Sequence, residues 1–277
     1  MTRSARRRRP VRRIAASRLA TGGWHPVDWL CELAGTAFVL FGAFVLVGVV
    51  ESPRSPVHQA LPATALRLTL IGASIGLLSM TVALSPLGRR SGAHLNPAVT
   101  LGFWARGQTH PHDLIGYAAA QIAGACLAAA AFRATAGSWA RTAGYARTEP
   151  APGLGEWPAL GIEVALTFCL VFAIFLMLSS ARTAPWTPVA SAAALTALVP
   201  IGGPPTGASM NPARTFGPDL VTGEFGALWV YFLGPCLGVM LAAAALPVLA
   251  SGRDLLTAKL FHDARYRSVH ASRLPTA

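Results

Sequence analysis

Two ten-residue stretches of this chain are near copies of each other: "SGAHLNPAVT" at residues 91–100 and "TGASMNPART" at residues 206–215. The chain contains only two asparagines, Asn96 and Asn211, and each is directly followed by Pro-Ala. Two unrelated asparagines would rarely share this context, so we treat the stretches as one repeated motif. An Asn-Pro turn between helices would explain a single copy, whereas a pair favours a functional motif.

The composition indicates a membrane protein. Hydrophobic residues make up 53% of the 277 residues and charged residues 12%, and the mean hydropathy is +0.49. Soluble domains usually carry about 25% charged residues. The four cysteines lie in or beside apolar segments without Cys-x-x-Cys spacing, so we expect small buried side chains. We expect no metal site and no cofactor.

Six segments are long and apolar enough to cross a hydrocarbon layer of about 30 Å at about 1.5 Å per residue. The fifth is short, and we expect it to break at Pro200. A polar loop marked by Gly and Pro is expected at residues 134–157. The predicted segments are 28–50, 63–87, 112–133, 157–180, 186–203 and 226–250.

Basic residues are concentrated at the two ends of the chain, and the net charge is +12. A basic arm alone would be compatible with nucleic-acid binding, but this arm borders an apolar segment too long for a signal peptide. We therefore favour charges that hold both termini in the cytoplasm of a cell (inner) membrane protein, with no nucleic-acid partner. The predicted parts are a cytoplasmic arm at 1–27, a membrane domain at 28–250 and a cytoplasmic tail at 251–277.

The membrane domain contains an internal repeat. Glu32 precedes Thr36 in the first segment as Glu163 precedes Thr167 in the fourth, and one Asn-Pro-Ala follows in each half. Three segments in each half force opposite orientations in the membrane. We therefore expect an inverted repeat of residues 28–133 and 157–250, with a functional site near the midplane on broken helices.

Each motif has the features of a helix start. Asparagine is a favoured cap, and proline suits the first helical position because its missing N–H has no partner there. The following residues predict half-helices of about 15 Å that stop at Gly107 and Gly223. Two positive helix ends would meet at the membrane centre, with spare amide hydrogens of Asn96 and Asn211 facing a pore for neutral molecules.

These residues resemble the major intrinsic protein family of aquaporins and aquaglyceroporins. Residues 117–125, "YAAAQIAGA", and 229–238, "WVYFLGPCLG", add to the resemblance, which covers roughly residues 28–250. It implies an all-α fold of six membrane helices and two half-helices, one pore per subunit, a homotetramer and 28–250 as the channel domain. It implies a pore centre made of Asn96, Pro97, Ala98, Asn211, Pro212 and Ala213.

The resemblance also implies a narrow filter at Gly76, Val199, Ala208 and Arg214. An arginine inside a membrane is costly and usually functional, although it could instead extend to the interface. Gly76 and Val199 depart from the water-selective pattern of an aromatic and a histidine, while Thr215 and Tyr231-Phe232 resemble water channels. Gly76 has a second interpretation as a small-xxx-small helix contact with Gly72. Water, glycerol, urea and metalloid acids all remain candidates.

The short residues before each Asn-Pro-Ala should present backbone carbonyls to the pore, because irregular backbone cannot face lipid. These residues are Gly92, Ala93, His94, Gly207, Ala208 and Ser209. We expect the His94 ring to pack nearby, with pH sensing as an alternative. Glu32 and Glu163 should brace these loops as hydrogen-bond acceptors, since an unpaired carboxylate in lipid is expensive; proton transfer is the alternative.

The leading function is a passive channel for water or small uncharged solutes that excludes ions and protons. A wider neutral-solute facilitator is the first alternative, and an ion-coupled transporter is a more remote one, because inverted repeats serve both. The sequence contains no paired carboxylates, His-Glu-x-x-His motif or nucleophile–base spacing, so we do not expect an enzyme.

Overall fold

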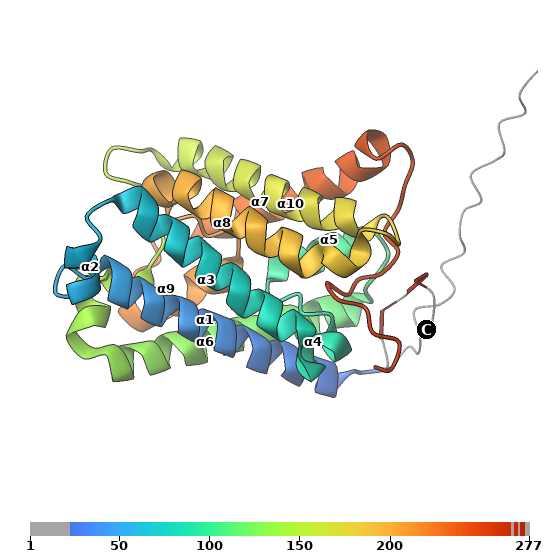
Figure 1. Ribbon diagram of the computed structural model, residues 1–277, viewed down its shortest axis with the longest axis horizontal. Coiled ribbons are helices and arrows are strands. Elements are labelled where there is room, and N and C mark those ends of the chain that lie inside the picture. Colours follow the sequence, from blue (N-terminus) through green and yellow to red (C-terminus); the bar gives the residue numbers. More distant parts are fainter. Residues whose placement is uncertain (1–22, 267–268, 271, 275–277) are drawn as a thin grey trace, which may run out of the picture.

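The computed structural model describes residues 23–266, 269–270 and 272–274, and the long elements within them are α-helices (Figure 1). Most of the predicted arm at residues 1–27 lies outside the described residues. Among these described residues, six helices are long and apolar enough to cross a membrane, as predicted. They are α1 (Pro26–Glu51), α3 (Thr64–Leu84), α6 (Pro111–Thr142), α7 (Glu156–Leu178), α8 (Thr187–Thr206) and α10 (Leu228–Leu249).

Two shorter helices follow the asparagines. α5 (Pro97–Ala105) and α9 (Pro212–Thr222) contain 9 and 11 residues. At about 1.5 Å per residue each reaches about half of a bilayer core. Gly107 after α5 and Gly223 after α9 have φ values of 67° and 78°, a left-handed backbone that glycine adopts readily at a helix end. The predicted half-helices and their ends are therefore confirmed.

The described part of the chain also contains four small helical elements, two of which serve to name the ends of the bundle. We call the end that carries α4 and the start of α1 the α4 end, and the opposite end, with α2, the α2 end (Figure 1). The small elements are α2 (Pro56–Ala60), α4 (Pro86–Ser91), η1 (Gly144–Ala146) and η2 (Ala184–Trp186).

Two helices are longer than the sequence indicated. α6 continues past residue 133 to Thr142 through a kink at Gly137, where φ is 53° and ψ is −118°. Glycine tolerates this backbone, so the first part of the expected loop is helical. The predicted break at Pro200 is also wrong, because α8 runs through it to Thr206. Neighbouring helices in a bundle allow prolines that would end a helix in water.

The packing follows an inverted repeat. α1 packs on α6 as α7 packs on α10, α3 and α8 join the halves, and α5 contacts α10 as α9 contacts α6. The first two pairs approach closely at equivalent glycines. A Cβ on Gly124 would lie 2.5 Å from the Leu33 oxygen, and one on Gly238 would lie 2.5 Å from the Val164 oxygen. Only glycine permits these backbone contacts.

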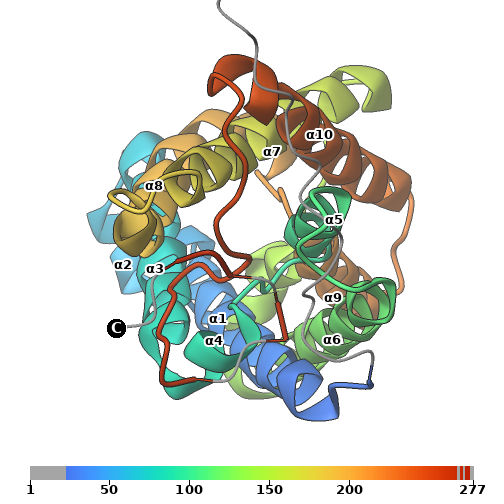
Figure 2. The same ribbon diagram turned by 90° about the vertical axis from the view of Figure 1, so that its right-hand side faces the viewer.

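The chain after α10 is packed against the bundle rather than separate from it. Ser251 and Gly252 have positive φ values of 55° and 78°, and the chain then turns back across the α4 end (Figure 2). Leu255, Ala258 and Leu260 belong to the same buried core as residues of the membrane helices. We call the described residues 253–266, 269–270 and 272–274 the tail. Residues on both sides of the predicted boundary at residue 250 therefore share one hydrophobic core.

Candidate pore

The two asparagines cap α5 and α9. The Asn96 Oδ1 accepts a hydrogen bond from the Ala98 backbone N–H at 2.9 Å, and the Asn211 Oδ1 accepts one from Ala213 at 3.0 Å. A proline occupies the first turn of each helix, where its missing N–H has no partner to lose. The capping geometry predicted from the sequence is present in both copies.

The amide groups of the two asparagines connect the repeats to each other. The Asn96 Nδ2 donates to the Met210 oxygen at 2.7 Å, and the Asn211 Nδ2 donates to the Leu95 oxygen at 3.0 Å. Each amide carries two hydrogens, so one remains on each side chain. Of the spare amide hydrogens expected from the sequence, one on each asparagine is therefore occupied by a carbonyl of the opposite loop.

Glu32 braces the loop between α4 and α5, residues 92–96, which we call the first loop. Its Oε1 accepts from the Ser91 hydroxyl at 2.6 Å and the His94 N–H at 3.0 Å. Its Oε2 accepts from the Leu95 N–H at 2.7 Å and the Gln121 amide at 2.8 Å. The side chain is fully buried, and these four donors replace the water that a carboxylate would otherwise require.

Glu163 braces the loop between α8 and α9, residues 207–211, which we call the second loop. Its Oε1 accepts from the Thr206 hydroxyl at 2.7 Å and the Ser209 N–H at 3.0 Å, and its Oε2 accepts from the Met210 N–H at 2.8 Å. The bracing geometry expected of both glutamates is therefore present, and the bonds to both loops follow the inverted repeat.

The braced loops have an unusual backbone. Ala93, Leu95, Ala208 and Met210 have φ values of 55°, 54°, 48° and 52°. Left-handed conformations of residues other than glycine cost on the order of 1–3 kcal/mol each and persist where the surroundings impose them. The hydrogen bonds to the two buried carboxylates supply this constraint. In both halves, the strained backbone of the loop and the hydrogen bonds that hold it therefore lie at equivalent positions.

A cavity of about 100 Å³ lies between the two loops, and its wall includes both asparagines and the filter candidates Val199, Ala208 and Arg214. Other parts of the wall come from α1, α3, α7 and α8 and are mostly aliphatic. The loop and half-helix residues on the wall are Ala93, His94, Leu95, Asn96, Val99, Ala208, Ser209, Met210, Asn211 and Arg214.

The predicted carbonyl positions agree with this wall only in part. Ala93, His94, Ala208 and Ser209 line the cavity, but Gly92 and Gly207 are not among the described lining residues. The Gly92 oxygen instead accepts a hydrogen bond from the Leu260 N–H of the tail at 3.0 Å.

Within the loop residues before the two asparagines, Leu95 and Met210 line the cavity and were missed by sequence reasoning. Their carbonyls accept the asparagine amides of the opposite repeat. Their place directly before each asparagine was visible in the sequence, but their left-handed backbone carried no sequence signal.

The His94 ring packs as expected. It stacks on Phe103 with ring centroids 4.6 Å apart. Its Nδ1 lies 3.2 Å from the Thr100 hydroxyl, and its Nε2 lies 2.8 Å from the Ala258 oxygen of the tail. The ring thus connects the first loop with α5 and the tail, and it is fixed by contacts on several sides.

Arg214 is held at the cavity wall by two groups. Its guanidinium donates to the Ala146 oxygen at 2.6 Å, and its Cζ lies 5.7 Å from the centroid of the Phe44 ring. A cation over an aromatic face is stabilised by the ring quadrupole. The side chain therefore stays inside the bundle rather than extending along the interface.

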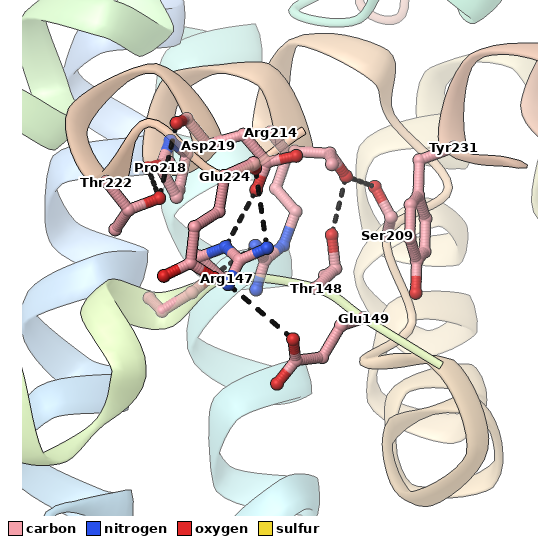
Figure 3. Close-up of polar contacts among 12 residues, drawn as sticks. Arg147, Thr148, Glu149, Ser209, Arg214, Pro218, Asp219, Thr222, Glu224 and Tyr231 are labelled. Atoms are coloured by element: carbon pink, nitrogen blue, oxygen red, sulfur yellow. Dashed lines mark hydrogen bonds and ion pairs between the residues drawn. The ribbon is translucent and has the colours of Figure 1, made fainter. Parts of the chain in front are cut away.

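Figure 3 shows the polar network that surrounds Arg214. The Thr215 hydroxyl lies 2.6 Å from the hydroxyls of both Thr148 and Ser209, and Arg147 forms an ion pair with Asp219 at 3.1 Å. These contacts fasten the chain after η1 to α9. The carbonyl that receives the arginine is consequently fixed as well.

The position of Gly76 differs from the filter prediction. A Cβ built there would lie 2.7 Å from the Ala192 Cα and 2.8 Å from the Ala192 oxygen. Gly76 therefore lies in the contact between α3 and α8, and Ile75 and Ser79 are the α3 residues on the cavity wall. This agrees with the alternative interpretation of Gly72 and Gly76 as a small-xxx-small contact, because a Cβ on Gly72 would lie 2.6 Å from the Leu195 oxygen.

One group of potential metal ligands occurs among the described residues. Ligand atoms of His25, His112 and Asp113 lie within 4.8 Å of one another. The two Asp113 oxygens already accept hydrogen bonds, from the His25 Nδ1 at 2.9 Å and from the Trp29 Nε1 at 2.9 Å. We assign this cluster a structural role, because its bonds tie the start of α1 to the start of α6.

Comparisons with known proteins agree with this geometry. The profile described as Major intrinsic protein matches residues 28–246. Aquaporin NIP1-1 of Zea mays is 35% identical over 222 residues, which cover 78% of this chain and 72% of that protein. Aquaporin AqpM of Methanothermobacter thermautotrophicus is 37% identical over 193 residues, which cover 65% of this chain and 76% of that protein.

A solved structure supports the fold independently. The X-ray structure of the aquaglyceroporin from Plasmodium falciparum aligns with a TM-score of 0.67 at 18% identity and covers 82% of this chain and 99% of that chain. In the part of the chain that the structure describes, six spanning helices, two half-helices and a cavity lined by Asn96 and Asn211 define an integral membrane channel of the aquaporin fold. The chain belongs to the major intrinsic protein family. Its relatives are channels rather than enzymes, and it is a passive channel for water or small solutes.

Proposed function

We propose that this channel conducts water together with small uncharged solutes and excludes ions and protons. The observation that supports the breadth of solutes is the filter wall. Arg214 supplies one charged donor, and the other two filter residues on the cavity wall, Val199 and Ala208, are apolar. A solute with a polar edge and an alkyl edge would satisfy both sides of this constriction.

Ion exclusion follows from the two half-helices. α5 and α9 begin at Asn96 and Asn211 on the same cavity, and each helix start carries about half a positive charge. Arg214 adds a full positive charge to the same wall. Cations are repelled there, while a neutral solute can accept the remaining amide hydrogens through its lone pairs.

The wider neutral-solute channel is favoured over a strictly water-selective one. Thr215 and Tyr231, which resemble water channels, form hydrogen bonds within the protein. Thr215 bonds to the Ser209 hydroxyl, and the Tyr231 hydroxyl donates to the Thr206 oxygen at 2.8 Å. Neither lines the cavity among the residues described. Thr215 and Tyr231 therefore stabilise the loop structure, whereas the apolar Val199 contacts the solute directly.

An ion-coupled transporter is less well supported. Such a transporter would need ionisable groups on the path. Glu32 and Glu163 are occupied as acceptors for the loops, and neither belongs to the described cavity wall. The same bonds weigh against a proton-carrying role for them.

The solute range can be tested in proteoliposomes by stopped-flow light scattering. We expect faster shrinkage than in empty liposomes under a sorbitol gradient, and measurable entry of glycerol or urea. Val199→His should lower glycerol and urea entry relative to water because it adds bulk and a donor. Val199→Leu adds bulk alone and separates the two effects. Unchanged glycerol-to-water ratios in Val199→His would contradict the assigned filter.

We further propose a homotetramer in the cell (inner) membrane, with both termini cytoplasmic. The exposed faces of the spanning helices carry large apolar side chains, such as Leu30 and Ile201, that suit lipid or a neighbouring subunit. The excess of Arg and Lys at the chain ends supports the orientation. Mass measurement of the purified protein and protease access from each membrane face test these two statements.

A further inference from the structure

The tail crosses the mouth of the channel at the α4 end. In Figure 2 it runs in red across the space enclosed by the helices. Leu260 is 6% exposed and is the tail residue on the wall of the cavity that also contains Asn96 and Arg214. The cavity is therefore bounded by the arginine towards one end and by a leucine of the tail towards the other.

The tail is anchored on the loop that leads to Asn96. The Leu260 N–H donates to the Gly92 oxygen at 3.0 Å, and the His94 Nε2 lies 2.8 Å from the Ala258 oxygen. Both loop groups belong to residues that the sequence had placed in the path. The tail thus forms hydrogen bonds with the Gly92 carbonyl and the His94 ring, two groups that would otherwise face the entrance of the channel.

Further contacts fix the tail on both sides of Leu260. The Leu256 N–H donates to the Leu178 oxygen of α7 at 3.0 Å, and Asp254 and Asp263 form ion pairs with Arg106 at 2.7 Å and Arg89 at 2.9 Å. The tail is therefore connected to α7, to the chain after α5 and to α4.

Two titratable side chains among the described tail residues, Lys259 and His270, are buried within the same region. The His270 Nε2 lies 2.9 Å from the Ser91 oxygen and 3.1 Å from the Tyr117 hydroxyl. The Lys259 Nζ donates to the Arg89 oxygen. Burial lowers the pKa of the Lys259 ammonium to about 8. Burying a charged group is costly unless its partners are specific, so the docked position is defined by these bonds.

We infer that Leu260 is a permeability-determining residue and that the docked tail closes the α4 end of the channel. The family match ends at residue 246, so this closure belongs to a part of the chain outside the matched region. Solute enters from the α4 end when the tail leaves its place on Gly92 and His94. The filter residues at Arg214 act independently of that step.

A cleavage experiment tests this inference on protein that has already folded. A protease site is inserted between Gly252 and Arg253. The full-length channel is cleaved in detergent, separated from the tail fragment with its loss confirmed by mass, and reconstituted beside uncleaved protein. We expect faster water entry per channel after cleavage. Equal rates for cleaved and uncleaved channels, both faster than empty liposomes, would overturn the closure. Rates no faster than empty liposomes for both would contradict the proposed function and, with it, the closure.

Leu260→Ala provides a second variant without cleavage. Truncating a buried leucine should lower the ratio of docked to undocked tail by about 30-fold or more, so water permeability should rise towards that of the cleaved channel. Leu233→Ala is the matched control, because Leu233 is 42% exposed on the outside of α10 and should leave permeability unchanged. A Leu260→Ala channel as slow as the intact protein would contradict the role of this side chain.

Discussion

Replacing Gly76 by alanine should destabilise the protein. The added Cβ would lie 2.7 Å from the Ala192 Cα and 2.8 Å from its oxygen. Ordinary carbon contacts are about 3.5–4.0 Å, so α3 and α8 would have to separate by about 1 Å. The obstructing atoms are backbone, which cannot move aside as a flexible side chain can.

The size of the effect follows from two opposing terms. Overpacking costs about 1–3 kcal/mol, and a backbone obstruction places this site at the upper end. Alanine is better than glycine in a helix by about 1 kcal/mol, which leaves a net loss of about 2 kcal/mol. Gly161 in α7 has no atom within 4 Å of its Cβ position. Gly161→Ala therefore keeps only the favourable term and serves as the matched control.

Unfolding of the purified protein in detergent measures this difference. Tryptophan fluorescence followed during heating or addition of a denaturing detergent should give a lower midpoint for Gly76→Ala than for the wild type, and an equal or higher midpoint for Gly161→Ala. Equal midpoints for the two variants would refute the packing argument. A filter role for Gly76 predicts a changed glycerol-to-water ratio with no loss of stability.

Three further predictions concern charges and amides. Glu163→Gln should place an NH2 against a backbone N–H such as that of Met210, lowering stability by about 2–4 kcal/mol, whereas the exposed Glu156→Gln should not; equal unfolding midpoints would contradict this. Burial lowers the pKa of His270 from 6.5 to about 3. The ratio of docked to undocked tail is therefore highest above pH 6.5 and falls below it, by about 30-fold at pH 5. Permeability should rise as the pH falls, and a permeability that stays constant between pH 7.5 and 5 would argue against this coupling. Asn96→Asp keeps the cap oxygen but removes the amide and adds negative charge, so normal conduction and ion exclusion in that variant would show that the amide is dispensable.

The features that the sequence predicted correctly are local or repeated. Asn-Pro at a helix start has a direct physical meaning, and finding it at both Asn96 and Asn211 identified two half-helices. The parallel placement of Glu32 and Glu163 indicated equivalent braces, and each accepts hydrogen bonds from its own loop. A repeat doubles every local signal, which explains why the pore centre was accessible from sequence.

The features that the sequence missed depend on lateral neighbours. Counting positions along a helix placed Gly76 at the filter level, but its direction is set by the crossing of α3 with Ala192 of α8. The amides of the asparagines looked free because the opposing carbonyls come from residues more than a hundred positions away. Nothing in "LLTAKLF" indicated that Leu260 would reach the cavity, since its contact is with a loop distant in sequence.

The tail also breaks the symmetry that the repeat creates. Gly92 and Gly207 occupy equivalent loop positions, yet Gly92 is bonded by Leu260 of the tail, while a Cβ on Gly207 would meet Thr148 of the chain after η1. Leu260 lines the cavity, whereas Thr148 is not among the described lining residues. Solute choice at Val199 and closure at Leu260 therefore depend on different contacts. A Val199 variant should change the ratio of solutes at a constant open fraction, and a Leu260 variant should change total flux at a constant ratio.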